Sequence, residues 1–169
     1  MNKEFLESER LFLKPLSFEE LQCINNNELD NIETQIELES LLDSVKLAIS
    51  KKLIKMKNID ENIHKWYTYW IIINKDNQKG IGFIGFKGVP DANGYLEVGY
   101  SISSNYRRNR FMTEALETLV RWAGKFQGGK GIIARALKTN FGSIKVLNNC
   151  NFELFSSTEQ ENIYINKLR

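Results

Sequence analysis

The sequence predicts an α/β fold: a single mixed sheet, mostly antiparallel and of about six to seven strands, with helices on both faces. Three observations support this class. Residues 66–102 hold three β-rich runs separated by polar turns, which predicts an antiparallel meander. Residues 112–126 place apolar side chains three to four positions apart, the period of an amphipathic helix. The apolar run at 130–137 follows that helix, and such a crossover makes it parallel to the preceding strand.

Before the meander we expect one strand and two helices. Residues 10–16 alternate weakly between apolar and polar types, which predicts a short first strand. Ser17 and Glu20 have the spacing of a capping box, so a helix is expected to begin at Ser17. Apolar residues recur between positions 36 and 56 and predict a long second helix.

The end of that second helix is basic. A solvated face and attraction to the negative helix C-terminus explain the basic run without a functional role. Its members are Lys51, Lys52, Lys55 and Lys57. The single histidine, His64, follows in a polar connector without an obvious partner, and we expect it to be structural or at the surface.

The remaining elements complete the sheet. The amphipathic helix is expected to end at Gly128, because glycine commonly terminates helices. Asn140 then caps a short helix. The strands expected from residue 66 onward, of which the last two form a terminal hairpin, are 66–73, 81–86, 96–102, 130–137, 152–155 and 162–168.

Composition limits the function. The 169 residues are expected to form one domain, 1–169, and the net charge of +2 gives no general case for binding nucleic acid or an acidic membrane. No run approaches the roughly 20 apolar residues of a membrane span, and the N-terminus lacks a secretion signal. Cys23 and Cys150 match no zinc or redox spacing and are expected to be free thiols. These features predict a cytoplasmic protein.

One stretch suggests a chemical role. The strand at 96–102 leads through a polar turn into the amphipathic helix. A helix start has unpaired N–H groups and partial positive charge, both of which suit a phosphate. Arg107, Arg108 and Arg110 add full positive charges at that start. Strand, basic loop and helix together predict a phosphate-binding site.

Three segments carry a resemblance to a known family. Residues 106–116 resemble the acetyl-CoA signature of the GCN5-related N-acetyltransferases (GNAT), whose pattern is Arg/Gln-x-x-Gly-x-Gly/Ala. Residues 140–152 are similar to a second segment of that family. Residues 9–16 resemble the first strand of its Rim-type branch, which includes ribosomal-protein N-terminal acetyltransferases. The resemblance covers nearly the whole chain and implies the GNAT acyl-CoA N-acyltransferase fold, with acetyl-CoA as co-substrate and no metal.

The signature departs from the family pattern at two positions. Arg108 and Arg110 stand where glycine is usual, and Asn151 replaces a glycine of the second segment. Glycine lets backbone amides approach the pyrophosphate closely. Arginine can adopt ordinary helical dihedrals, and only a position with positive φ would strictly require glycine. We expect coenzyme binding to survive with altered side-chain contacts; weakened or lost binding is the alternative.

The resemblance also implies the geometry of the reaction. The strands carrying Glu97 and Ala134 splay apart, and the pantetheine arm enters the opening with its amides paired to backbone near Ser101 and Ile102. Glu97 is the candidate general base, direct or through water. The alternative is a carboxylate that faces solvent or pairs with a lysine.

For the departing thiolate, some family members use a tyrosine on the last helix, where this chain has Leu147. Ser143 is the remaining hydroxyl on that segment and the candidate hydrogen-bond donor to the sulphur. Its structural alternative is an ordinary third residue of a short helix. The other expected coenzyme contacts are Arg107, Arg108, Asn109, Arg110, Phe111, Met112, Thr113 and Asn140.

The predicted function is an acetyl-CoA-dependent N-acetyltransferase that passes an acetyl group to a primary amine by direct attack in a ternary complex. The acceptor is a protein N-terminus or a small-molecule amine, and the protein is a monomer or homodimer. Lys, Glu and Asp mix over the first seventy residues, which gives no preference for a polycation. The alternatives are a non-catalytic acyl-CoA-binding or regulatory module and, more weakly, a nucleic-acid binder that uses the arginine loop.

Overall fold

The computed structural model describes residues 4–126 and 128–168. Eight strands form one sheet in the order β1-β2-β3-β4-β5-β6-β8-β7. Neighbouring strands are antiparallel except β5 and β6, which are parallel. The strands are β1 Leu6–Glu7, β2 Leu11–Pro15, β3 Trp70–Asn74, β4 Gly80–Phe86, β5 Tyr95–Ile102, β6 Gly131–Leu137, β7 Glu153–Ser157 and β8 Glu161–Lys167.

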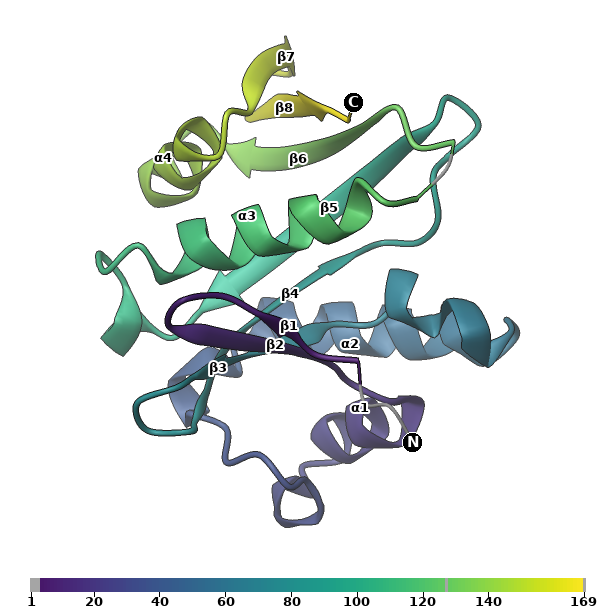
Figure 1. The fold of residues 1–169 in the computed structure, drawn as a ribbon, viewed down its shortest axis with the longest axis vertical. Helices are drawn as coiled ribbons and strands as arrows, with labels where there is room; N and C mark the ends of the chain where they lie inside the picture. The colour runs from purple at the N-terminus through teal and green to yellow at the C-terminus, as the bar shows by residue number, and fades with distance from the viewer. Residues whose placement is uncertain (1–3, 127, 169) are drawn as a thin grey trace.

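Helices cover both faces of the sheet (Figure 1). The α-helices are α1 Phe18–Asn25, α2 Asp43–Met56, α3 Phe111–Ala123 and α4 Phe141–Asn149. The short 3-10 helices are η1 Leu29–Asn31, η2 Leu38–Ser40, η3 Glu61–Trp66 and η4 Ser104–Tyr106. The predicted fold class is therefore confirmed, with one strand more than expected, because the two-residue β1 is too short to show an alternating pattern.

The alternation of side chains along β3 produces two cores. Trp70 and Ile72 join a cluster beneath α3, whereas Ile71 and Ile73 join a second cluster with α1 and α2. All four side chains are at least 90% buried. A strand buried on both faces has no polar alternation, which explains why this run is apolar throughout.

The long helix predicted from residue 36 is wrong over its first turns. Ile36 instead forms a parallel bridge with Gly80, and the Glu37 N–H donates to the Gly80 carbonyl at 2.8 Å. η2 follows, and the α-helix begins only at Asp43. Pairing with the sheet therefore overrides the local helical pattern.

Two further boundaries differ from expectation. The first meander strand begins at Trp70, not at Trp66, because η3 ends at Trp66, whose ring stacks on Trp122 with centroids 4.3 Å apart. α3 ends at Ala123, and the Phe126 N–H donates to the Ala123 carbonyl in a following turn. Phe126 still packs on Trp66, so the apolar period continues beyond the helix.

Other expectations are confirmed. The Glu20 N–H donates to the Ser17 hydroxyl and the Ser17 N–H to the Glu20 carboxylate, which completes the capping box. His64 contacts the Met56 carbonyl at 3.0 Å through Nε2, a structural role at the end of α2. Cys23 and Cys150 are free thiols. Across residues 4–126 and 128–168, no helix combines the length and apolarity needed to cross a membrane.

Lys52 corrects the expectation of a solvated basic run. The side chain is buried, and its Nζ donates to the carbonyls of Tyr67 and Phe86, each at 2.9 Å. It also lies 4.5 Å from the centre of the Tyr69 ring. Burial, reinforced by the positive charges of Lys55 and Lys87, lowers the pKa of Lys52 to about 7. This lysine ties α2 to the sheet.

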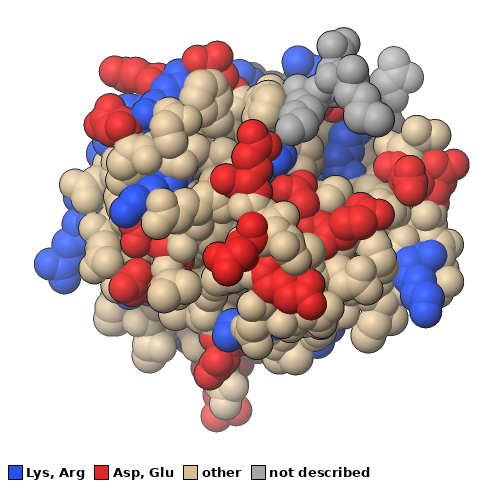
Figure 2. Space-filling model, turned by 90° about the horizontal axis from the view of Figure 1, so that it is seen from below, with Lys and Arg blue, Asp and Glu red and all other residues tan. Residues whose placement is uncertain are grey.

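Charge is also less evenly mixed than we expected. No Lys or Arg occurs between Lys14 and Lys46. Acidic side chains gather on the face that Figure 2 shows, viewed from below the orientation of Figure 1. The acidic residues of this segment, which includes α1, η1 and η2, are Glu19, Glu20, Glu28, Asp30, Glu33, Glu37, Glu39 and Asp43.

Candidate active site

The central feature of the site is an opening between β5 and β6. Ladder pairing joins Tyr95–Glu97 to Gly131–Ile133. Within the part of the chain that the structure describes, this pairing stops at Glu97, although β5 continues to Ile102 and β6 to Leu137. The backbone edge of β5 beyond Glu97 is thus available to another extended chain, and Ser101 and Ile102 lie on it.

The basic loop lies where β5 ends and α3 begins. Arg107, Arg108, Asn109 and Arg110 are all exposed, so four polar side chains surround the start of α3. Phe111, Met112 and Thr113 form the first turn of that helix. The loop therefore combines full positive charges with unpaired helix N–H groups, as the phosphate prediction requires.

The backbone of this loop has an unusual conformation. Arg108 has φ of 65° and Arg110 of 62°, both in the left-handed region that favours glycine. Asn151, at the third position where the family has glycine, has φ of 63°. Each of the three residues keeps the glycine-like conformation without being glycine. The expectation that ordinary helical dihedrals would suit the arginines is therefore wrong.

Two anchors hold the loop. The Tyr106 hydroxyl donates to the Glu37 carboxylate at 3.1 Å and accepts from the Asn77 side chain at 2.8 Å. On the other side, Glu114 of α3 accepts from the Ser8 hydroxyl at 2.8 Å, with Arg10 also bound to it. The loop is thereby fixed to the segment before α2 and to the β1–β2 turn.

Glu97 sits where the two parallel strands separate. It pairs with Lys87 of the chain after β4 and, at 3.2 Å, with Arg135 of β6. Burial alone raises the pKa of Glu97, but the hydrogen bonds and charges of Lys87 and Arg135 outweigh burial and hold the pKa below its ordinary value. The carboxylate is therefore ionised at neutral pH and is paired, as the alternative interpretation proposed. Its role as a base stays a prediction.

Ser143 lies at the first turn of α4, across from β5. The Asn140 side chain accepts from the Ser143 N–H at 3.1 Å, which confirms Asn140 as the helix cap. The Ser143 hydroxyl lies 2.8 Å from the Tyr100 hydroxyl. Burial raises the pKa of Tyr100 to about 12, so this phenol stays protonated at neutral pH.

Tyr100 is the residue that sequence reasoning missed. Its place in the alternation of β5 pointed to the core, and only the fold shows that its hydroxyl reaches α4. The signal available in the sequence was the loss of tyrosine at Leu147, which could have prompted a search for a hydroxyl on a neighbouring element. Leu147 itself is fully buried and packs in the core.

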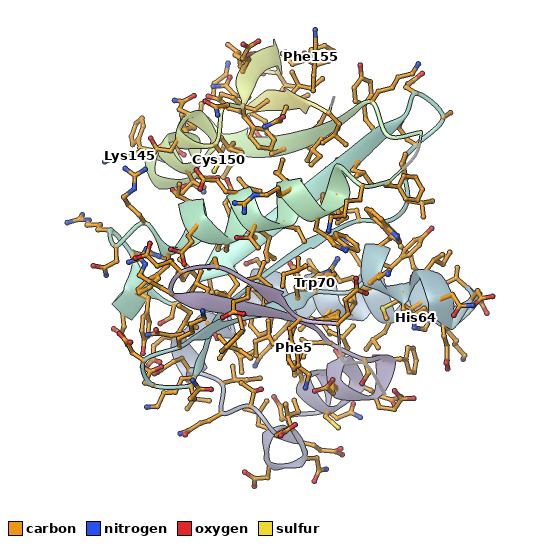
Figure 3. The ribbon with its side chains drawn as sticks, in the orientation of Figure 1. Phe5, His64, Trp70, Lys145, Cys150 and Phe155 are labelled. Carbon is orange, nitrogen blue, oxygen red and sulfur yellow. The ribbon has the colours of Figure 1, made fainter. Side chains whose placement is uncertain are left out.

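Cys150 lies at the end of α4, on its side toward α3 (Figure 3). Its thiol donates to the Thr113 carbonyl at 3.5 Å. Burial, and next the charge of Glu117, raise the pKa of Cys150 to about 12, so the thiolate is scarce at neutral pH. Lys145 of the same helix lies on the side of the molecule where the arginine loop is found (Figures 1 and 3).

The described residues contain no cluster of three or more His, Cys, Asp or Glu side chains able to hold a metal ion. One surface cavity of about 400 Å³ is lined by residues of β2, β3 and the segment after η1, including Lys14 and Glu33. Its strands, β2 and β3, are separated from β6 in the sheet by β4 and β5. The site is therefore defined by the separated strands and the basic loop, not by this cavity.

Separated parallel strands beside a basic helix start are the features that the resemblance implied for an acetyltransferase. A family model described as an acetyltransferase (GNAT) domain matches residues 10–153. The chain belongs to the GNAT family of acetyltransferases, which confirms the family and the enzyme class predicted from the sequence.

Similar proteins agree with this assignment. The uncharacterized N-acetyltransferase YjdG of Bacillus subtilis is 36% identical over 111 residues, which are 64% of this chain and 66% of that relative, slightly less than two thirds. The ribosomal-protein-S5-alanine acetyltransferase of Vibrio fischeri matches with a TM-score of 0.67 at 18% identity, over 98% of this chain and 97% of that one. RimL, a ribosomal L7/L12 α-N-protein acetyltransferase solved with coenzyme A, matches with a TM-score of 0.69 at 13% identity, over 98% of both chains.

Proposed function

We propose that the protein transfers an acetyl group from acetyl-CoA to a primary amine by direct attack in a ternary complex. The opening between β5 and β6, immediately before the basic loop, is the observation that carries this proposal. An extended pantetheine arm fits along the unpaired edge of β5 at Ser101 and Ile102. The pyrophosphate then falls at the loop of Arg107–Arg110 and at the first turn of α3, where Thr113 and the helix N–H groups lie.

The left-handed loop supports this fit. Backbone amides can approach a pyrophosphate only where the chain turns sharply, and glycine usually permits that turn. Arg108 and Arg110 keep the same turn, and both residues are exposed to solvent. Asn140, which caps α4 on the far side of the opening, is the remaining proposed coenzyme contact.

Glu97 is the proposed base. Its low pKa makes it a weak base, so it is best suited to remove a proton through water from an amine whose own pKa is near 8, as in a protein N-terminus. Lys87 and Arg135 hold the carboxylate at the point where the strands separate. Developing negative charge on the thioester oxygen needs a donor, and backbone N–H groups on the free edge of β5 serve that role.

Direct transfer to the amine, without an acetyl-cysteine intermediate, agrees best with the state of the buried thiol. An acetyl-enzyme formed on cysteine requires a thiolate nucleophile, and Cys150 is a buried thiol with a raised pKa. We place the reaction in the cytoplasm, where both cysteines stay reduced. The acidic segment between Lys14 and Lys46 favours a cationic acceptor, because its field attracts an ammonium group before the proton is lost.

An acceptor screen tests the proposal. Purified protein with acetyl-CoA is mixed with N-terminal peptides, polyamines, amino sugars and amine antibiotics. Release of coenzyme A thiol is followed together with the mass of each acceptor. Transfer to at least one amine, strongly slowed in Glu97→Gln and unchanged in Glu153→Gln, is the expected result. Glu153 is an exposed carboxylate on β7 and serves as the matched control. Coenzyme binding without transfer to any amine would instead establish the non-catalytic module.

A further inference from the structure

We propose that Tyr100 is a positioning residue, which orients the hydroxyl of Ser143 toward the sulphur of bound coenzyme A. The inference rests on the proposed function, because it assumes that coenzyme A lies between β5 and β6. It assigns a role to a side chain on the strand, whereas the resemblance pointed only to α4 for this step.

The first step of the argument is position. Tyr100 lies three residues past Glu97, on the part of β5 that no longer pairs with β6. Its side chain packs against the core cluster beneath α3 and is partly buried. The Tyr100 hydroxyl reaches the Ser143 hydroxyl at 2.8 Å and the Ser143 carbonyl at 3.4 Å. This hydrogen bond therefore joins β5 to α4, the helix that follows β6 in the chain.

The second step is the direction of the hydrogen bond. Each hydroxyl carries one proton, and the Tyr100 proton has acceptors on Ser143 at both the hydroxyl and the carbonyl. When Tyr100 donates to Ser143 Oγ, the Ser143 proton is free to point elsewhere. The bond from the Ser143 N–H to Asn140 fixes the same residue from behind. In that arrangement the Ser143 O–H is left to donate to another group, and we assign it to the sulphur of the coenzyme.

The third step is the chemistry. The amine nitrogen bonds to the acetyl carbon, and one amine proton passes to water or to Glu97. The carbon–sulphur bond then breaks and sulphur keeps the electron pair as a thiolate. The Ser143 O–H donates a hydrogen bond to that thiolate and keeps its proton. Tyr100 keeps its proton as well, so no proton passes between the two hydroxyls. The thiolate later takes a proton from solvent.

The structure explains why a second hydroxyl comes from the strand. At the position where some family members have tyrosine, Leu147 is fully buried and has no hydroxyl. Tyr100 of β5 reaches the same helix with its hydroxyl. The two hydroxyls together replace a single tyrosine on α4.

The pKa of the thiol of bound coenzyme A tests this inference without any acceptor. The thiolate absorbs in the ultraviolet, so a pH titration of protein saturated with coenzyme A reports that pKa directly. A donor to the thiolate lowers it, and we expect about one pH unit below free coenzyme A. Tyr100→Phe and Ser143→Ala should each return it toward the free value, and the double variant should add nothing further.

Three controls make the outcome decisive. Tyr95→Phe removes a phenol from the same strand before the opening and should leave the thiol pKa unchanged. Ser143→Thr keeps a hydroxyl and should keep the lowered pKa. Tyr100→Met fills the same space without a hydroxyl and replaces Tyr100→Phe if that variant does not fold. A lowered thiol pKa that survives loss of the Tyr100 hydroxyl would overturn the inference, whereas failure of the native protein to bind coenzyme A would overturn the proposed function.

Discussion

Arg108 and Arg110, separated by one residue, both adopt the left-handed backbone conformation that the family usually assigns to glycine. A side chain in this region costs about 1–2 kcal/mol through contact of Cβ with the neighbouring carbonyl. The chain accepts this strain twice within three residues. The turn at the start of α3 is therefore retained although its usual residues are absent, and the strain lies at the site where the phosphate is expected.

This strain predicts that glycine stabilises the loop. Arg108→Gly and Arg110→Gly should each raise the free energy of unfolding by about 0.5–1 kcal/mol, because relief of strain exceeds the entropy that glycine loses on folding. Urea denaturation measures the change. Arg107→Gly is the control: Arg107 has φ of −68° and ψ of 158°, so glycine there should destabilise. Destabilisation by all three substitutions would show that the side chains of Arg108 and Arg110 stabilise the loop more than its backbone strains it.

Replacement of Glu97 should affect the rate of acetyl transfer much more than the free energy of unfolding. Glu97→Gln should lower the rate of acetyl transfer by about 10²-fold, the lower range for loss of a general base. The unfolding free energy should change by less than about 1 kcal/mol, because Lys87 and Arg135 are 58% and 41% exposed and solvent weakens both pairs. If the loss of unfolding free energy were as large as the rise in the activation free energy for acetyl transfer, Glu97 would be a structural residue.

The lowered pKa of Glu97 also has a pH consequence. A carboxyl group whose folded pKa lies below its unfolded value contributes stability above the ordinary carboxyl range, and this contribution is lost as pH falls through the folded value. Acid unfolding of Glu97→Gln should therefore begin from a slightly lower stability and lose less of it below pH 4.5 than the native protein does. An unchanged acid profile would contradict the ion pairs.

The lowered pKa of Lys52 gives a pH dependence of the same sign as that of Glu97, at higher pH. Its folded pKa of about 7 lies below the unfolded value of 10.5, so the unfolded chain binds more protons between those limits. The unfolding free energy should therefore rise with pH from about 7 to 10.5. Lys52→Met removes the titrating group and should flatten this rise, while Lys51→Met, at an exposed position beside it, should not. A rise of the same slope in Lys52→Met would mean that other groups cause it.

The hydrogen bonds of Glu114 to the β1–β2 turn should contribute measurably to the stability of the protein. Its carboxylate accepts from the Arg10 N–H at 3.1 Å, from the Arg10 guanidinium at 3.2 Å and from the Ser8 hydroxyl at 2.8 Å. Glu114→Ala leaves these donors without this acceptor and should cost about 1–3 kcal/mol. Thermal unfolding of this variant is compared with that of Glu117→Ala, in which an exposed glutamate of α3 is replaced. Similar losses in both variants would exclude a special role for Glu114.

Much of the fold could be predicted because local rules agreed with tertiary packing. The capping box at Ser17, the parallel strand at β6 and the cap at Asn140 all depend on nearby residues or on a general rule of chain topology. The start of α2 could not be predicted in the same way, because the bridge between Ile36 and Gly80 joins residues far apart in the sequence.

The candidate site divides along the same line. The basic loop follows from sequence, since its charges and the helix start are adjacent. The conformation of Arg108 and the contact between Tyr100 and Ser143 do not, because a positive φ is not encoded by arginine and a bond across 43 positions depends on the finished sheet. The burial of Lys52 was missed for a similar reason, since its two carbonyl partners come from other elements.

Calorimetric titration of acetyl-CoA into the native protein tests most directly whether this loop binds the coenzyme. The result we expect is micromolar affinity, weakened about tenfold or more when Arg107 and Arg110 are both replaced by alanine. Arg121→Ala, which removes an exposed arginine from the last turn of α3, should bind as the native protein does. Absence of binding to the native protein would contradict the proposed function and would mean that the arginines at the glycine positions have closed the site.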